Sequence, residues 1–198
     1  LLDGEKFWLR GLTYYDAGKR SFYTKDKSVV TPADLAGKKV RVMESITASN
    51  MVKAMGGSPT PVSYGELYTA LQQGIVDAAE NNPPSLYTSK HYEVCKFYSL
   101  DEHAALPDVV IVSTKVWESL TPQEQQWLQE AADESATYQY ELWAASTAES
   151  MRELEKAGVT ITYPDKAPFR EAVKGIYDQL AIEQPEIYKI AMAIQAVN

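Results

Sequence analysis

An arginine set between two valines is the feature of this sequence that most directly suggests binding chemistry. Lys39-Val-Arg-Val-Met43 alternates as a strand does, which places Val40 and Val42 on one face and Arg41 on the other. A guanidinium that faces a protein interior without a partner is costly. Arg41 therefore needs solvent, a structural salt bridge such as one to Glu44, or a fixed anion, and the sequence alone leaves these three open.

A second group of polar side chains could present hydrogen-bond donors and acceptors. Glu80-Asn-Asn-Pro-Pro84 follows a strand-like segment, and its two prolines predict a rigid loop that displays amides; the alternative is an ordinary turn with an asparagine helix cap. Tyr64 lies inside the capping box Ser63–Glu66, where it can stack on a ligand or simply pack. Arg20 follows Gly18-Lys19 and can equally be a surface cation in a turn.

The sequence contains none of the motifs expected for metal, phosphate or nucleophilic chemistry. Gly56-Gly-Ser-Pro59 lacks the lysine of a phosphate loop and is typical of a helix terminator and turn. His91 and His103 lie twelve residues apart, which is not the spacing of a metal pair on a helix. Cys95 stands alone and is typical of a small apolar filler. We therefore expect no metal site and no cofactor.

Composition narrows the class of protein further. The chain has 198 residues, of which 45% are hydrophobic and 23% charged, close to the average of globular proteins. Its net charge of −8, with no basic block, argues against nucleic acid as a partner. No apolar run approaches the roughly 18 residues of a membrane span, and a single cysteine cannot form an internal disulfide.

The hydrophobic periodicity alternates short strands with helices, which predicts an α/β fold with a largely parallel sheet. The run Val109–Val112 is typical of a strand covered on both faces. A second capping box at Thr121–Glu124 is followed by a stretch without proline or glycine. This stretch predicts one long helix or a kinked pair of helices to Lys156, long enough to span two lobes. The other expected strands are 8–15, 39–43, 75–78 and 159–163, and the other helices are 48–55, one from Ser63, 83–91, 169–180 and 187–197.

Several short stretches, weak alone but specific in series, resemble the substrate-binding proteins of tripartite ATP-independent periplasmic (TRAP) transporters, the DctP-type family. The matching stretches cover nearly the whole chain. Ala78 departs from the family pattern, which usually has glycine after the aspartate. The stretches are Gly37-Lys-Lys-Val-Arg-Val-Met-Glu-Ser45, Met55-Gly-Gly-Ser-Pro-Thr-Pro61, Tyr64-Gly-Glu-Leu-Tyr-Thr-Ala-Leu-Gln72, Gly74-Ile-Val-Asp-Ala-Ala-Glu-Asn-Asn82, Tyr92-Glu-Val-Cys-Lys-Phe97 and Gly158-Val-Thr-Ile161.

The resemblance implies a periplasmic binding protein type II-like fold, with two lobes, hinge strands and a long helix that spans both lobes. Residues 1–17 and 107–146 would form an incomplete first lobe, and residues 18–106 and 147–198 the second lobe. On this view the sequence begins inside the first lobe, since Leu1 is neither a start methionine nor the beginning of a signal peptide. Val109–Val112 would then lack sheet neighbours, and its free edge could support self-association.

The resemblance also implies a function and a set of site residues. The expected protein is a periplasmic receptor that binds a small organic acid (a C4-dicarboxylate, a uronate or aldonate, or a related acidic sugar) by lobe closure. It would deliver this ligand to a sodium-coupled membrane permease, without covalent chemistry. Arg41 would grip the carboxylate with its two-pronged guanidinium, assisted by further side chains. The implied assistants are Arg20, Asn81, Tyr64, Ser45 and His103.

Two other classes of function remain as alternatives. A hydrolase or lyase acting on an acidic sugar would use Glu80 or His103 as its base, but the sequence offers no set of nucleophile, base and orienting residue. A plain interaction module built on the long helix would not explain why polar residues recur at the family's spacing.

Overall fold

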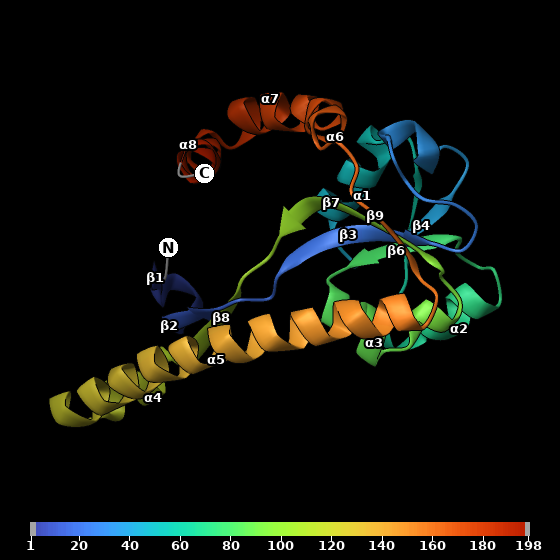
Figure 1. The fold of residues 1–198 in the computed structure, drawn as a ribbon. Coiled ribbons are helices and arrows are strands. Elements are labelled where there is room, and N and C mark those ends of the chain that lie inside the picture. Colours follow the sequence, from blue (N-terminus) through green and yellow to red (C-terminus); the bar gives the residue numbers. More distant parts are fainter. Residues whose placement is uncertain (1–2, 197–198) are drawn as a thin grey trace.

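Two β-sheets form the frame of the computed structural model, which describes residues 3–196 (Figure 1). The larger sheet has six strands in the order β5-β4-β6-β3-β7-β9, and the smaller has three in the order β1-β2-β8. The strands are β1 (Asp3–Gly4), β2 (Leu9–Tyr15), β3 (Lys19–Thr24), β4 (Lys39–Val42), β5 (Ser58–Pro61), β6 (Ala78–Asn81), β7 (Phe97–Ala105), β8 (Asp108–Ser113) and β9 (Thr160–Thr162).

Eight α-helices and four short 3₁₀ turns are assigned among the described residues. The predicted end of the last helix at Val197 lies outside these residues, as does Leu1. The helices are α1 (Ile46–Ala54), α2 (Leu67–Gln72), α3 (Pro83–Thr88), α4 (Thr114–Ser119), α5 (Pro122–Lys156), α6 (Ala167–Ala172), α7 (Lys174–Glu183) and α8 (Pro185–Gln195). The 3₁₀ turns are η1 (Glu5–Phe7), η2 (Pro32–Leu35), η3 (Tyr64–Glu66) and η4 (His91–Glu93).

The larger sheet is mixed, which corrects the expectation of a largely parallel sheet. Strand β4 runs parallel to β5 and β6, and β7 runs parallel to β9. Strand β3 runs antiparallel to both of its neighbours, β6 and β7. A strand can run parallel to its neighbour only when a crossover connection returns the chain to the same end of the sheet. Strand β3 has no such crossover, because it continues directly from β2 of the smaller sheet.

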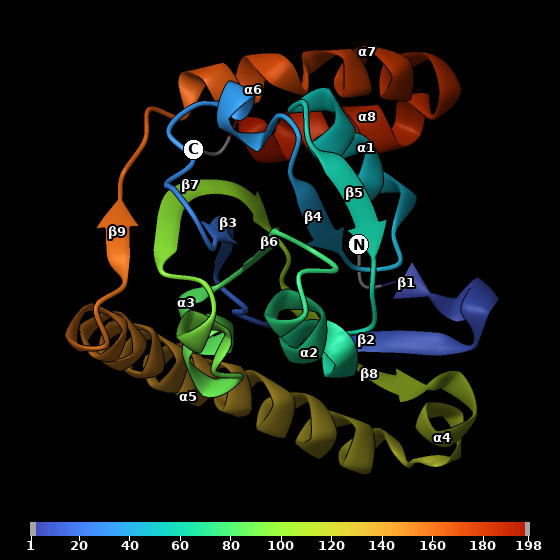
Figure 2. The ribbon, with the colours of Figure 1, turned by 90° about the vertical axis from the view of Figure 1, so that its right-hand side faces the viewer.

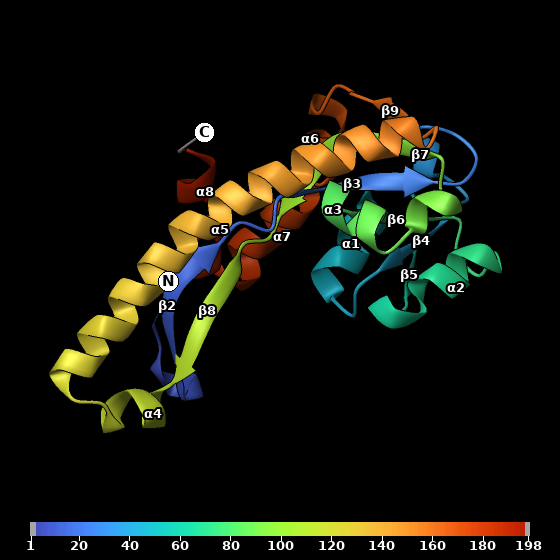
Figure 3. The same cartoon turned by 60° about the horizontal axis from the view of Figure 1, so that its bottom comes forward.

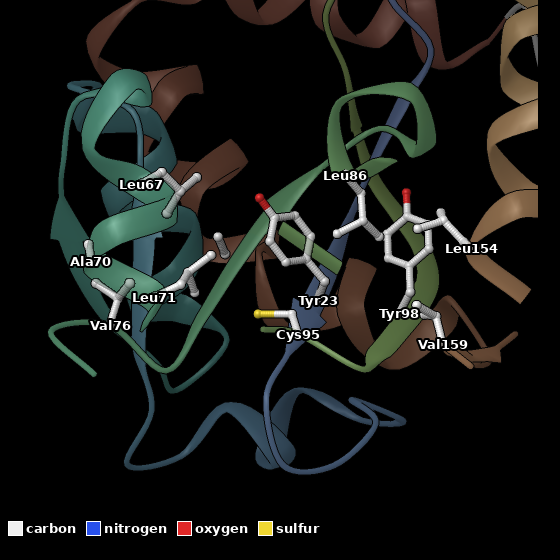
Figure 4. Close-up of a cluster of buried hydrophobic side chains, with 11 residues drawn as sticks. Tyr23, Leu67, Ala70, Leu71, Val76, Leu86, Cys95, Tyr98, Leu154 and Val159 are labelled. Atoms are coloured by element: carbon white, nitrogen blue, oxygen red, sulfur yellow. The ribbon is translucent and has the colours of Figure 1, made fainter. Parts of the chain in front are cut away.

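Helices cover both faces of the six-stranded sheet, so its strands bury side chains on both sides (Figure 2). Tyr23 and Ala79 belong to a cluster beneath α2, α3 and α5, which Figure 4 shows. Their sequence neighbours Phe22 and Ala78 belong to a second cluster beneath α1 and α6. Val40 and Val42 lie in this second cluster, so the predicted separation of the two valines from Arg41 is confirmed.

The predicted helix from Thr121 to Lys156 is confirmed as α5, a single helix of 35 residues. Thr121 and Glu124 form the predicted capping box, in which the carboxylate of Glu124 accepts from the Thr121 backbone N–H at 2.8 Å. Helix α5 lies along β2 of the smaller sheet and along α3, which covers the larger sheet, and thus bridges the two sheets (Figures 1 and 3).

Three other sequence predictions are wrong in their bounds. Ile75 and Val76 are not strand; their backbone N–H groups close the turn after α2 by donating to the carbonyl of Ala70, and β6 begins only at Ala78. Helix α3 ends at Thr88 rather than near His91. The single helix expected over 169–180 is divided into α6 and α7.

Strand β8 is the clearest departure from expectation in the smaller sheet. Among the described residues it pairs only with β2, so it forms an edge. Val109 is 44% exposed and Ile111 52% exposed. The coverage on both faces that the apolar run predicts is therefore not found in the described part of the chain.

The chain passes between the two sheets twice in extended form, at Asp16–Gly18 and at Leu106–Pro107 (Figure 1). Gln139 of α5 holds the first passage: its side-chain oxygen accepts from the Asp16 N–H at 2.9 Å, and its nitrogen donates to the Asp16 carbonyl at 2.8 Å. Gly18 has a φ of +68°, and a Cβ there would lie 3.0 Å from the Trp143 indole nitrogen. This passage therefore favours glycine.

Candidate functional site

All six predicted site residues lie at one edge of the six-stranded sheet. Strands β4, β5, β6 and β7 share one direction and end at this edge, while the antiparallel β3 begins there. In open α/β sheets, ligands bind outside the carboxyl ends of the strands. The edge collects Arg41 and Ser45 from the end of β4, Tyr64 after β5, Asn81 at the end of β6, Arg20 at the start of β3, and His103 near the end of β7.

Arg41 is buried without an acidic partner. It is only 4% exposed, and its Nε donates to the Val62 carbonyl at 2.8 Å. Its guanidinium carbon lies 5.7 Å from the centre of the Tyr64 ring. No acidic side chain of residues 3–196 forms an ion pair with it, and Glu44 is exposed. A solvated arginine on the sheet face and a Glu44 salt bridge are thus both wrong. Burial lowers the pKa of Arg41, and the more distant attraction of Glu80 does not offset it.

Tyr64 lies next to Arg41 and is held on two sides. Its hydroxyl lies 2.7 Å from the Ser89 hydroxyl oxygen, and its ring meets the His91 ring at 5.8 Å in an edge contact. The side chain remains 45% exposed. An aromatic ring that is fixed in place and yet exposed offers a surface on which a ligand can stack.

His91 lies buried beneath Tyr64. In the sequence, its only suggested role was that of a metal ligand. Its Nδ1 is 3.0 Å from the hydroxyl of Tyr23. Burial, with a further contribution from the charge of Arg41, lowers the pKa of His91 to about 4. The imidazole is therefore uncharged at neutral pH. No sequence pattern pointed to it, because its neighbours come from three separate strands and turns.

Arg20 presents the opposite case, since its guanidinium donates four hydrogen bonds. Nε donates to Glu80 Oε2 at 2.5 Å, and Nη2 donates both to Glu80 Oε1 at 2.8 Å and to the Glu80 carbonyl at 2.9 Å. Nη1 donates to Asn81 Oδ1 at 3.0 Å. Burial opposes the charge, but the attraction of Glu80 outweighs it and raises the pKa of Arg20. The interpretation of Arg20 as a surface turn cation is wrong.

His103 belongs to the same charged network as Arg20. Its Nδ1 lies 2.7 Å from Asp101 Oδ2, and its ring stacks on Phe22 at 4.3 Å. Its Nε2 lies 3.5 Å from Glu80 Oε2 and makes no hydrogen bond within the described residues. Burial disfavours the imidazolium, but Asp101 and Glu80 together outweigh it and raise the pKa of His103 to about 9. His103 is thus a buried cation at neutral pH.

A bulge in β7 aims Asp101 and His103 at the site. Arg20 and Phe22 are two residues apart on β3, but their partners on β7, Ala104 and Ser99, are five apart. Glu102 within the bulge has a φ of +48°, a strained value for a residue with a side chain. Bulges of this kind redirect side chains next to functional sites. Three consecutive polar residues from Asp101 are the signal in the sequence for this bulge, but only His103 was predicted as a site residue.

Asn81 is oriented by the same network. Its Oδ1 accepts from Arg20 and from the Asn82 backbone N–H at 2.9 Å, which leaves its Nδ2 as the group without a hydrogen-bond partner among the described residues. Glu80 and Asn81 lie in β6 and are buried, which corrects their placement in a rigid loop. Asn82 caps α3, as the alternative interpretation held, and Ser45 caps α1 by accepting from the Ala48 N–H at 3.3 Å.

Five of the six predicted residues form two groups on opposite faces of the sheet edge. Arg41, Tyr64 and Asn81 lie on the face of the Tyr23 cluster, and Arg20 and His103 on the face of Phe22. Arg20 joins the groups through Asn81. A cavity of about 680 Å³ lies on the Phe22 face and is lined by Asp101, His103 and side chains of α6, α7 and α8; Arg41 and Tyr64 do not line it.

Other chemistry finds little support in the described residues. No group of three or more His, Cys, Asp and Glu side chains in residues 3–196 is arranged to hold a metal ion. Cys95 is buried in the core, and burial raises the pKa of its thiol to about 12, which keeps it protonated. Within the same residues, no helix has the length and apolar character needed to cross a membrane.

The sheet edge can be compared with known proteins. Residues 5–184 match the family model of bacterial extracellular solute-binding proteins, family 7 (DctP). The chain belongs to this family. Members include a "Solute-binding protein" of Chromohalobacter salexigens, which is 41% identical over 93% of this chain and 55% of its own length. The sialic acid-binding periplasmic protein SiaP of Vibrio cholerae is 33% identical over 94% of this chain and 59% of its own length.

Solved structures agree with this family assignment. A TRAP periplasmic solute-binding protein of C. salexigens with bound D-glucuronate superimposes with a TM-score of 0.93 at 39% identity, over 98% of this chain and 67% of that chain. A homologue from Xanthobacter autotrophicus with bound β-D-galacturonate gives a TM-score of 0.90 at 41% identity, over 97% and 64%. The predicted fold class is confirmed, and the chain spans somewhat more than half the length of the curated relatives it matches.

Proposed function

We propose that this chain is a periplasmic solute-binding protein of a TRAP transporter that binds a small organic acid, foremost a uronate or a related acidic sugar. The observation that carries the proposal is Arg41, a residue only 4% exposed for which the one hydrogen bond found among the described residues is that of Nε to the Val62 carbonyl. A buried charge is tolerated when it is paired, and a carboxylate matches the guanidinium fork. Relatives with bound D-glucuronate and β-D-galacturonate support the choice of ligand.

The neighbours of Arg41 suit a ligand with both a carboxylate and hydroxyl groups. Asn81 offers an amide N–H₂ whose orientation is fixed by the bonds to its oxygen. Tyr64 offers an exposed ring face beside the guanidinium. Ser45 lies at the N-terminus of α1, where backbone N–H groups favour anions.

Arg20 and His103 take a different role in this proposal. Because Glu80 occupies the Arg20 fork, Arg20 acts on the ligand chiefly by fixing Asn81. The Nε2 of His103 faces Glu80 and helps to keep that carboxylate charged. Burial alone would raise the pKa of Glu80, but the attraction of Arg20 and His103 is stronger and lowers the pKa. The network thus stabilises the shape of the site.

The ligand would be held by closure of two lobes. We assign residues 1–17 and 107–146 to the first lobe and residues 18–106 and 147–198 to the second. The two sheets, joined at Asp16–Gly18 and Leu106–Pro107, support this division, as does α5, which packs on both. Carboxylate pairing at Arg41 would favour the closed state over the open one.

The partners follow from the same assignment. The protein would act in the periplasm and deliver the bound acid there to a sodium-coupled TRAP permease in the membrane. Strand β8 has a free edge among the described residues with exposed apolar side chains, so a second copy of the chain is a candidate partner through strand pairing.

The hydrolase or lyase alternative meets an electrostatic objection. At neutral pH the raised pKa of His103 keeps it protonated, so it cannot serve as a base. Glu80 is ionised but held by Arg20 through both carboxylate oxygens. We therefore propose a binding protein rather than an enzyme.

A thermal-shift and calorimetry panel tests the proposal. We expect D-glucuronate or D-galacturonate to raise the melting temperature and to bind without turnover, while D-glucose, which lacks the carboxylate, does not bind. Turnover of a uronate would favour the enzyme, and a complete absence of binding to acids would favour the interaction module.

A further inference from the structure

The turn after α3 forms a two-point support for Tyr64. Ser89 is the C-cap of α3, Lys90 adopts a left-handed conformation with a φ of +58°, and His91 begins η4. This reversal lets residues on either side of Lys90 reach the same ring: the Ser89 hydroxyl oxygen lies 2.7 Å from the Tyr64 hydroxyl, and the His91 ring lies 5.8 Å from the Tyr64 ring at 70°. Ser89 lies at the polar end of the tyrosine, while His91 meets the ring itself.

His91 is itself fixed from the sheet below. Its Nδ1 is hydrogen-bonded to the hydroxyl of Tyr23 at 3.0 Å, and the two rings stack at 5.8 Å with an interplanar angle of 27°. Tyr23 is fully buried and His91 is 2% exposed, so neither ring can move freely. The other ring nitrogen, Nε2, makes no hydrogen bond within the described residues.

Among the described residues, Arg41 of β4 is the one charged group that acts on the pKa of His91. The rings in contact with His91 are Tyr23 of β3, whose pKa is raised well above its usual value by burial, and Tyr64 of η3. No acidic side chain of the described residues pairs with the imidazole. The positive charge of Arg41 therefore acts on His91 without a compensating anion.

We propose that His91 is a positioning residue that fixes the Tyr64 ring beside Arg41 and couples acid binding at Arg41 to proton binding on its own imidazole. The coupling, though not the support of Tyr64, rests on the proposed function. A carboxylate bound at Arg41 cancels the charge that disfavours the imidazolium. By linkage, the protein then takes up protons as it binds the acid at mildly acidic pH, and the acid binds more tightly as His91 becomes protonated.

The support of Tyr64 is tested without any ligand. The aromatic NMR signals of Tyr64 are followed from pH 7 to pH 3 in the wild type and in His91→Phe, which keeps a ring but cannot titrate. We expect the Tyr64 signals to shift with the midpoint of His91 in the wild type and to stay constant in His91→Phe. Equal shifts in both proteins, or none in the wild type, would overturn the positioning role.

A second variant protects this test from a folding defect. His91→Phe leaves the buried Tyr23 hydroxyl without a partner, which destabilises the protein. The double variant Tyr23→Phe/His91→Phe removes both polar groups together and should give the same constant Tyr64 signals. Titrating Tyr64 signals in the double variant would contradict the assignment to His91.

The coupling is tested with D-glucuronate by calorimetry at pH 5 in two buffers of different ionisation enthalpy. We expect proton uptake on binding to the wild type and less uptake by His91→Phe. Uptake that is equal in the two proteins would overturn the coupling. At pH 7, His91→Ala should bind about twofold to fourfold more weakly because Tyr64 loses its ring contact, and His91→Phe should restore most of the affinity.

These readouts separate the two proposals. If D-glucuronate and the other acids fail to bind the wild type while the Tyr64 signals still follow His91, the proposed function and the coupling fail and the positioning role stands. If acids bind but the Tyr64 signals ignore His91, the proposed function stands and the positioning role fails.

Discussion

Arg20 and Arg41 lie at the same edge of the six-stranded sheet, but their electrostatic surroundings are opposite. Arg20 donates four hydrogen bonds, three of them to Glu80 and one to Asn81. Arg41 donates one, to the Val62 carbonyl, and has no ionic partner among residues 3–196. The protein thus pairs the charge of Arg20 with its own Glu80, and Arg41 is the guanidinium that we propose pairs with a ligand.

The two pKa directions express the same difference. Burial disfavours both guanidinium ions, but Glu80 outweighs it at Arg20 and raises the pKa, whereas nothing outweighs it at Arg41, where the pKa is lowered. Arg20 therefore contributes to the folded state, and Arg41 carries a desolvation cost that a bound carboxylate would relieve.

The largest effect we expect is on stability, from breaking the paired arginine. Arg20→Met leaves Glu80, 2% exposed, without its main partner, and should lower the free energy of unfolding by about 3 kcal/mol. Arg41→Met removes an unpaired buried charge and should leave stability unchanged or raise it. Urea denaturation of both variants measures the contrast, and a larger loss in Arg41→Met would reverse our comparison.

The next effect concerns ligand affinity. Arg41→Lys keeps the charge but loses the two-pronged geometry, so D-glucuronate binding should weaken about 100-fold. Titration calorimetry measures this change, with urea denaturation as the check that the variant is folded. Near wild-type affinity would remove Arg41 from the role we give it.

A third prediction concerns the pH dependence of stability that the charged network of Arg20, Glu80 and His103 confers. The pKa of His103 is about 9 in the folded protein, above its ordinary value of 6.5. Its stabilising contribution should therefore be fully present below about pH 6.5 and be lost as the pH rises through 9, with a fall in unfolding free energy of about 3 kcal/mol.

The matched control for this pH effect is His103→Gln, which keeps a polar side chain but does not titrate. Its unfolding free energy should change less between pH 6.5 and 9 than that of the wild type. Parallel pH profiles for the two proteins would show that another group is responsible.

The smallest effect concerns the ring beside Arg41. Tyr64→Ala should weaken D-glucuronate binding about fivefold, because it removes a stacking surface and no charge. Tyr64→Phe keeps the ring and loses only the contact with Ser89, so its affinity should stay close to wild type. A loss in Tyr64→Ala that matched the loss in Arg41→Lys would mean that the ring, rather than the charge, dominates binding.

The sequence predicted local features better than distant ones. The bounds of α5 and the face of Arg41 follow from capping and from alternation between adjacent residues, and both are confirmed. The ion pair of Arg20 with Glu80 joins residues 60 positions apart and depends on the register of β3 against β6, which no local pattern encodes.

The same reasoning explains the residues that sequence analysis missed. Asp101 reaches His103 because β7 bulges opposite a single residue of β3, and a bulge breaks the alternation on which strand predictions depend. His91 meets Tyr64 only after a left-handed residue reverses the chain. Val76 closes the core from a turn, whereas Ile75 beside it is 50% exposed, and two adjacent apolar residues look the same in a turn as in a short strand.

A crystal structure of the protein with D-glucuronate would test the central claim most directly. We expect the two carboxylate oxygens to lie about 2.8 Å from Nη1 and Nη2 of Arg41, with Arg20 still paired to Glu80. A carboxylate bound elsewhere, with Arg41 turned to an acidic side chain of its own chain, would contradict the account.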